Sequence, residues 1–162
     1  MTTQAKVLVL GIGNLVMSDD GVGVKIVQRL QKDYRFVDQV EIMDGGTLGL
    51  DLLPKLEGIE RLIIVDAVET DMEPGTCIRL SGEELPIALE TKLSPHQMGL
   101  KDLLSVAELM GHSPREMVLI GVQPGSIEMD TELTPVVEAQ VDILIQNVLN
   151  ELLVFGFEPL AP

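Results

Sequence analysis

Runs of aliphatic residues alternate along this chain with stretches in which apolar residues have helical spacing. The first run, at residues 6–10, has no polar position after Lys6 and ends at Gly11, which is typical of a strand buried on both faces. An amphipathic helix is predicted after Asp19 and Asp20, because apolar residues there recur three or four positions apart. These apolar positions are Val22, Ile26, Val27 and Leu30. A strand, a glycine-rich turn and a helix in this order open a parallel α/β unit.

The same alternation continues over the rest of the chain. Apolar runs predict strands over residues 40–43, 61–67 and 117–122, and an edge strand over residues 76–80. Helical spacing predicts helices over residues 48–56 and 98–110, and a long closing helix from Pro135. The apolar stripe of the closing helix is Val137, Val141, Leu144, Val148 and Leu152. The pattern predicts an α/β fold in three layers, a mostly parallel, twisted sheet with helices on both faces.

The chain is expected to fold as one domain that spans residues 1–162. No repeat, linker or low-complexity segment divides these 162 residues, and the length suits a single core. Hydrophobic residues make up 46% of the chain and aromatic residues only 2%, so aliphatic side chains must form that core. Residues 1–5 and 156–162 are expected to be flexible termini, since the last segment holds one glycine and two prolines.

The charge and the cysteine content narrow the possible partners. Acidic residues outnumber basic ones 26 to 11, and the net charge of −15 would repel a nucleic-acid backbone. A partner protein with a basic surface or tail would instead be attracted. The single cysteine, Cys77, has no internal disulfide partner and is expected to be a buried core thiol. With no cationic leader and no apolar run of membrane-spanning length, a cytoplasmic protein without membrane insertion is expected.

Polar clusters stand at the ends of three predicted strands. They are the segment from Gly11 through Asn14 to Asp20, the segment of residues 44–47, and Asp66. In an open parallel sheet, ligands bind outside the carboxyl ends of the strands, so these clusters are expected to converge there. Each has a structural alternative. Asp19 and Asp20 could cap the following helix, and Asp66 could be a hydrogen-bonded structural carboxylate.

Several familiar activities are disfavoured by what the sequence lacks. A dinucleotide-binding fingerprint would need a third glycine where Val16 stands, and Asp19 and Asp20 would repel a pyrophosphate at that turn. The chain has neither the His-Glu-x-x-His motif nor the Gly-x-Ser-x-Gly motif of common hydrolases. Of the two histidines, His96 precedes a predicted helix and His112 lies in a loop. Two carboxylates and one imidazole would be an acceptable ligand set for a borderline metal.

The ordered set of motifs resembles the hydrogenase maturation endopeptidases, and the resemblance extends from about residue 6 to the closing helix. The motifs are Gly11-x-Gly13-Asn14, Ser18-Asp19-Asp20-Gly21-Val22-Gly23, Asp44-Gly45-Gly46-Thr47, Asp66-Ala67 and Ser94-Pro95-His96-Gln97. Members of this family remove a C-terminal extension from the large-subunit precursor of a nickel-iron hydrogenase after nickel has been inserted. The resemblance therefore implies a peptidase whose partner is that precursor, with nickel supplied by the precursor.

Residue by residue, the resemblance implies that Asp20, Asp66 and His96 are both the metal-reading and the catalytic residues. The segment Asp44, Gly45, Gly46 and Thr47 matches a loop implicated in substrate handling and is a second-tier site. Two mechanisms remain open: the metal positions and activates the scissile bond, or the metal is a checkpoint while an aspartate does acid–base work, as in aspartic peptidases. A non-catalytic nickel-sensing maturation chaperone would use the same three ligands.

Overall fold

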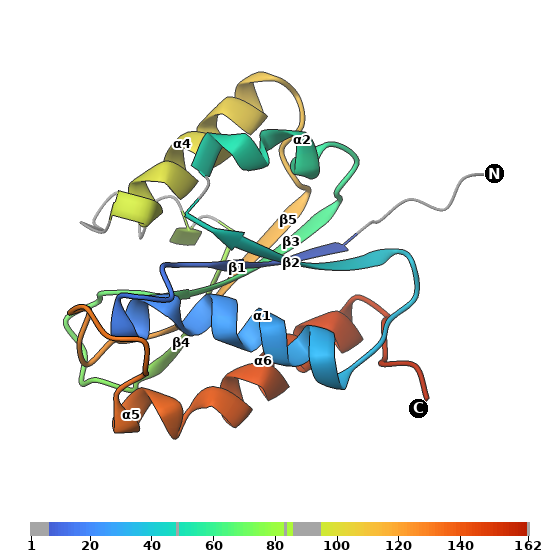
Figure 1. Cartoon of the computed structure of the whole chain (residues 1–162). Helices are drawn as coiled ribbons and strands as arrows, with labels where there is room; N and C mark the ends of the chain where they lie inside the picture. Colours follow the sequence, from blue (N-terminus) through green and yellow to red (C-terminus); the bar gives the residue numbers. More distant parts are fainter. Residues whose placement is uncertain (1–6, 48, 83, 86–94, 162) are drawn as a thin grey trace.

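A five-stranded sheet organises the molecule, which was analysed as a computed structural model (Figure 1). The structure describes residues 7–47, 49–82, 84–85 and 95–161, with the side chains of residues 95–99 excepted. The strands are β1 (Val7–Ile12), β2 (Val40–Gly46), β3 (Arg61–Ala67), β4 (Cys77–Ser81) and β5 (Glu116–Val122). The helices are α1 (Val22–Asp33), α2 (Leu53–Leu56), α4 (Pro95–Leu109), α5 (Pro135–Glu138) and α6 (Val141–Val154). Two 3-10 turns, η1 (Ser18–Gly21) and η2 (Gly49–Leu52), precede α1 and α2.

The strand order is β2-β1-β3-β5-β4, and only the last strand runs antiparallel to its neighbour. Val9 at the centre of β1 is paired with Ile42 on one side and with Ile63 on the other. The carboxyl ends of four parallel strands consequently meet at one edge, which we call the carboxyl edge. This arrangement confirms the predicted mostly parallel sheet and the predicted edge strand near residue 77.

Helices cover both faces of the sheet and produce three layers (Figure 1). Successive side chains of β1 point alternately to the two helical layers, because the side chains of a strand alternate between the faces of its sheet. Val7 and Val9 belong to the core cluster formed with α1 and α6, whereas Leu8 and Leu10 belong to the cluster formed with α2 and α4. The α/β fold and the aliphatic core are therefore confirmed.

The structure corrects three predicted elements. The closing helix is two helices, because the N–H of Gln140 donates to Val137, three residues back, and tightens the chain between α5 and α6. The predicted helix over residues 48–56 is the turn η2 followed by the short helix α2. Strand β2 continues to Gly46 instead of ending at Met43, since Gly46 pairs with Ile12 across a register shift.

The described part of the tail makes contacts with the rest of the molecule. Phe155 and Phe157 pack against the cluster of α1 and α6, and the N–H of Leu160 donates to the carbonyl of Arg35 over 2.7 Å. Residues 1–6 and 162 lie outside the described residues. The flexibility of residues 1–5 and 156–162 stays a prediction. No helix among the described residues is long and apolar enough to cross a membrane.

Candidate functional site

Glycines let the start of α1 approach the sheet at backbone distance. A Cβ atom on Gly23 would collide with the carbonyl oxygen of Val65, the residue that precedes Asp66 in β3. A Cβ atom on Gly13, whose φ is +138°, would collide with the carbonyl oxygen of Asp20. Gly23 and Gly13, the second glycine of the incomplete nucleotide fingerprint, therefore have a packing role. They allow η1 to lie against the end of β3.

This approach brings two of the predicted site residues to the same edge of the sheet. Asp20 is buried in η1, and its Oδ2 accepts the backbone N–H of Asn14 over 3.1 Å. Asp66 is buried near the end of β3, and its Oδ1 accepts the N–H of Ala67 over 2.8 Å. Two buried carboxylates therefore stand at the ends of contacting elements. Their position is that of a functional site in a parallel sheet.

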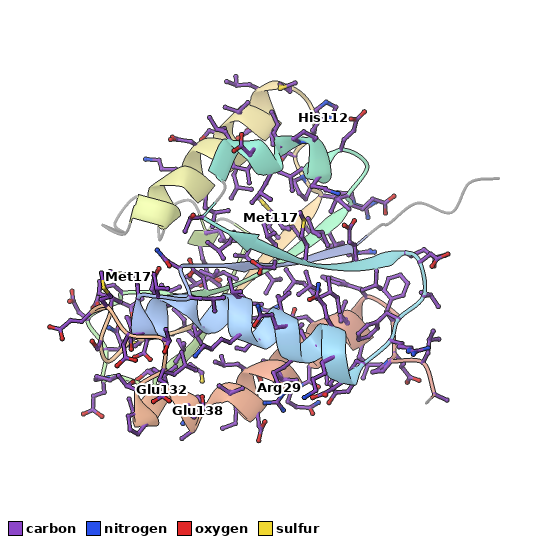
Figure 2. All side chains as sticks on the ribbon, viewed as in Figure 1. Met17, Arg29, His112, Met117, Glu132 and Glu138 are labelled. Carbon is purple, nitrogen blue, oxygen red and sulfur yellow. The ribbon has the colours of Figure 1, made fainter. Side chains whose placement is uncertain are left out.

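The third predicted ligand is only partly described. His96 lies in the first turn of α4, and its side chain is outside the described residues. Within the described side chains, no group of three His, Cys, Asp or Glu residues could hold a metal ion. Convergence of Asp20, Asp66 and His96 on one cation therefore stays a prediction. His112 follows the opposite end of α4, and Figure 2 shows it at the far end of the molecule from Met17, which precedes η1.

The second-tier segment lines a cavity beside η1. Asp44 Oδ1 accepts the N–H of Gly46 over 2.9 Å, which stabilises the turn that Gly46 makes with a φ of +50°. The N–H of Gly13 donates to the carbonyl of Gly46 over 2.9 Å and joins the ends of β1 and β2. The resulting cavity has a volume of about 240 Å³. It is lined by Gly13, Asn14, Leu15, Val24, Asp44, Gly46 and Thr47.

Asp19 has a role that the sequence did not predict. Its buried carboxylate accepts the N–H groups of Gly125, Ser126 and Thr134 and the hydroxyl of Thr134, over 2.7 to 3.1 Å. It thereby fixes residues 125–134 against η1. The helix-capping interpretation was wrong for α1, whose N-cap is Gly21 and which has no side-chain cap. Nothing in the sequence pattern pairs Asp19 with a segment more than 100 residues away.

Gln123 is a second residue that sequence reasoning missed. It is buried directly after β5, and its Oε1 accepts the N–H of Thr70 over 2.7 Å and the hydroxyl of Thr70 over 3.0 Å. Its Nε2 donates to Glu69 Oε1 over 2.9 Å. Gln123 therefore orders the loop that follows β3 at the carboxyl edge. A polar residue at the end of an apolar run, the signal that selected Asp66, would also have selected Gln123.

Cys77 lies half-buried on β4, where it pairs with Val122 of β5. Its thiol is 3.5 Å from Gln140 Oε1, and burial raises the pKa of the thiol. A raised pKa keeps the sulfur protonated and unreactive at neutral pH. The expectation of a buried core thiol was wrong in its degree of burial, because Cys77 packs against the core cluster of α1 and α6 but is only half-buried.

Comparisons with known proteins point to one family. Residues 24–151 match the family model described as "Hydrogenase maturation protease". The chain is 42% identical to the "Hydrogenase 2 maturation protease" of Escherichia coli K12 over 94% of each chain. It is 41% identical to the hydrogenase expression/formation protein HupD of Rhodobacter capsulatus, over 94% of this chain and 74% of that protein.

Solved structures give the same result. The hydrogenase maturating endopeptidase HybD from E. coli superposes with a TM-score of 0.92 at 42% identity over 96% of each chain. The [NiFe] hydrogenase maturation protease HybD from Thermococcus kodakarensis superposes with a TM-score of 0.75 at 31% identity. That match covers 88% of this chain and 96% of the archaeal one.

Proposed function

Since the chain belongs to the hydrogenase maturation protease family and is an endopeptidase of hydrogenase maturation, we propose a specific reaction for it. It removes the C-terminal extension of a nickel-iron hydrogenase large-subunit precursor after nickel has been inserted. Nickel is part of the substrate in this proposal, not a resident cofactor. The reaction takes place in the cytoplasm, where large-subunit precursor and protease meet before the mature enzyme is assembled.

The observation that carries this proposal is the pair of buried carboxylates, Asp20 and Asp66, at the carboxyl edge. They stand on elements that contact each other, and α4 starts with His96 in its first turn. Two carboxylates and an imidazole are suitable ligands for nickel that already has ligands in the precursor. We therefore assign Asp20, Asp66 and His96 to reading the metal and placing the scissile bond.

The peptide bond is cleaved by water in this scheme. A carboxylate accepts a proton from the water while the water oxygen attacks the scissile carbonyl carbon, and the same carboxyl group then passes this proton to the departing amine as the C–N bond breaks. Either Asp20 or Asp66 can be that base, as in an aspartic peptidase. The segment from Asp44 to Thr47 borders the cavity beside η1 and handles the flanking substrate residues.

A non-catalytic nickel-sensing chaperone is the competing role for the same three side chains. The E. coli relatives that match in sequence and in fold are named as a maturation protease and a maturating endopeptidase, which favours cleavage. The net charge of −15 suits a basic precursor segment and disfavours nucleic acid as a partner.

The proposal is tested by incubating the protein with a nickel-loaded precursor and measuring the masses of the products by mass spectrometry. Wild type should yield two fragments whose masses add up to that of the precursor plus one water. Asp20→Asn and Asp66→Asn should each slow cleavage at least about 100-fold, in the range expected for loss of a general base. Asp33→Asn is the matched control, because Asp33 pairs with Arg29 at the exposed end of α1. An intact precursor with wild type would contradict the proposal in favour of the chaperone.

A further inference from the structure

Three apolar side chains are exposed on two segments beside η1. Val16 is 49% exposed, Ile127 is 52% exposed and Met129 is 83% exposed. We call these three residues the edge strip. Single exposed apolar side chains are common on protein surfaces, but a group of them next to a functional site is typical of an interaction surface.

Backbone hydrogen bonds place the two segments of the edge strip side by side. The N–H of Asp130 donates to the carbonyl of Val16 over 3.0 Å, and the N–H of Ser18 donates to the carbonyl of Asp130 over 2.8 Å. These bonds form a parallel bridge between Met17 and Asp130. Val16 and Met129 each precede a bridge partner, so the two residues are neighbours across this bridge.

The segments that carry the edge strip are held in place. Ser18 Oγ donates to the carbonyl of Glu132 over 2.9 Å, and Lys25 Nζ donates to the carbonyl of Thr131 over 2.7 Å. Asp19 adds its bonds to Gly125, Ser126 and Thr134. The exposed apolar side chains are therefore presented by an ordered surface, which lowers the entropic cost of binding a partner.

The charge around the edge strip is negative. Three exposed acidic residues lie in the same loop, next to Ile127 and Met129 or shortly after them. They are Glu128, Asp130 and Glu132. Lys25 is the one cation among the described residues that is bonded to this loop, through the carbonyl of Thr131. A segment that carries both apolar side chains and Lys or Arg residues would complement this surface in hydrophobicity and in charge.

The edge strip is continuous with the candidate site. Val16 lies four residues before Asp20, and the N–H of Asn14, two residues before Val16, donates to the Asp20 carboxylate. Figure 2 shows Met17 and Glu132, which flank the edge strip in sequence, at the same end of the molecule. A polypeptide bound at the edge strip would therefore lead directly to η1.

We propose that the edge strip binds the part of the hydrogenase precursor that flanks the scissile bond, through apolar side chains interspersed with Lys or Arg. This inference rests on the proposed function for the identity of the partner. It assigns Val16, Ile127 and Met129 to substrate affinity and leaves bond cleavage to the buried carboxylates.

The test uses two matched pairs of variants of the full chain. Ile127→Glu is compared with Leu153→Glu, whose parent residue is 53% exposed, and Met129→Glu is compared with Leu109→Glu, whose parent residue is 87% exposed. Initial cleavage rates are measured over a range of nickel-loaded precursor concentrations. Each edge-strip variant should raise KM at least about 10-fold with kcat changed less than about 2-fold, as for a residue at the centre of an interface. The controls should keep the wild-type KM.

Charge provides a second readout. Glu128→Lys should raise KM, and added salt should raise the wild-type KM because screening weakens the attraction between the exposed carboxylates and the precursor. An unchanged KM in both edge-strip variants would overturn the inference, as would an equal rise in the controls.

Direct binding distinguishes the inference from the proposed function. If wild type binds the precursor without cutting it and the edge-strip variants bind at least about 10-fold more weakly, the edge strip is confirmed and the proposed reaction is wrong. If wild type cuts the precursor and the edge-strip variants bind it as tightly as wild type does, the reaction stands and the docking assignment is wrong. If wild type shows no binding, both are wrong.

Discussion

Asp19 and Asp20 are sequence neighbours whose carboxylates serve different segments. Asp19 accepts four hydrogen bonds from residues 125–134, whereas Asp20 accepts the N–H of Asn14 and lies in η1, which contacts β3. One residue is therefore expected to determine stability and the other activity.

Asp19→Asn should lower the free energy of unfolding by about 2 to 4 kcal/mol, because an amide cannot accept at both atoms and its NH₂ would face backbone donors. Chemical denaturation with urea measures this loss. Thr134→Val, which deletes the hydroxyl that donates to Asp19, should cost less, about 1 kcal/mol. An unchanged urea midpoint for Asp19→Asn would show that the four bonds add no net stability.

The two histidines should differ in their effect on processing and not in their effect on stability. His96→Ala should reduce processing at least about 100-fold while the urea midpoint stays within error, because the motif that matches the family contains His96. His112→Ala should leave processing within about 2-fold of wild type, since this loop residue lies beyond the far end of α4. Equal losses in both variants would show that the choice of His96 was wrong.

The role of a residue could be predicted where the signal for it lies nearby in the sequence, and not where its hydrogen-bond partners are distant. Asp66 was identifiable because a carboxylate at the end of a buried strand is chemically unusual, and burial at this position is confirmed. Asp19 was not, because its donors come from residues 125–134 and no local pattern marks such a long-range pairing. The roles of Asp20, Asp66 and His96 rest on family resemblance and stay predictions.

Helix α1 is the element that determines where η1 lies. Its apolar face packs on the sheet as the spacing of Val22, Ile26 and Leu30 predicted, and all three are buried. Its close approach depends on Gly23, which lies against the carbonyl of Val65. The turn η1, which contains Asp20, can therefore lie next to β3 because Gly23 of α1 has no side chain.

Gly23→Ala should destabilise the protein by about 3 kcal/mol or more and should also reduce processing, because α1 must move away from β3 to fit a methyl group. Gly111→Ala is the matched control. Its φ is +75° but a Cβ atom there meets nothing within 4 Å, so the cost should be about 1 kcal/mol from backbone strain alone. Urea midpoints of both variants check the difference. Equal costs would mean that the close approach of α1 is not the reason for the glycine.

Element boundaries were predicted well where an apolar run ends sharply. The strand over residues 61–67 has the predicted bounds, since Arg61–Ala67 is a central strand with buried neighbours on both sides. Boundaries were predicted poorly where tertiary contacts decide them. Strand β2 extends into the glycines because Gly45 packs closely against Leu10, Ile12 and Leu52. The break between α5 and α6 contains no proline or glycine that would have predicted it.

At the scale of the whole molecule, the sheet order places Asp20 and Asp66 at one edge, and the proposed set of metal-reading groups is small. Two carboxylates and one imidazole leave coordination positions for ligands of the precursor. A protease that held nickel tightly by itself could not distinguish a loaded precursor from an empty one, since specificity requires a difference in affinity.

The free protein should accordingly bind Ni²⁺ weakly, with a dissociation constant above about 1 μM, equivalent to a binding free energy weaker than about −8 kcal/mol. Calorimetric titration of metal-stripped protein checks this value. Stoichiometric nickel or zinc retained through purification would instead indicate an ordinary metallopeptidase with a resident ion.

The overall architecture was the most predictable level, because alternation of buried strands and amphipathic helices leaves few arrangements other than a parallel sheet covered on both faces. The aliphatic composition predicted the core, and the two clusters on either side of the sheet are built from Val, Ile and Leu. The loop contacts of Asp19 at the carboxyl edge had no comparable signal, because side-chain hydrogen bonds between distant loops leave no periodicity in a sequence.

The central claim is that cleavage depends on nickel in the precursor, and one comparison tests it directly. The same precursor is prepared with and without nickel, each form is incubated with the metal-stripped protein, and the fraction cut is followed by mass spectrometry. The nickel-loaded precursor should lose its C-terminal extension, and the nickel-free precursor should stay intact at the same protein concentration. Cleavage of both forms at equal rates would contradict the account, because Asp20, Asp66 and His96 would then not be reading a metal.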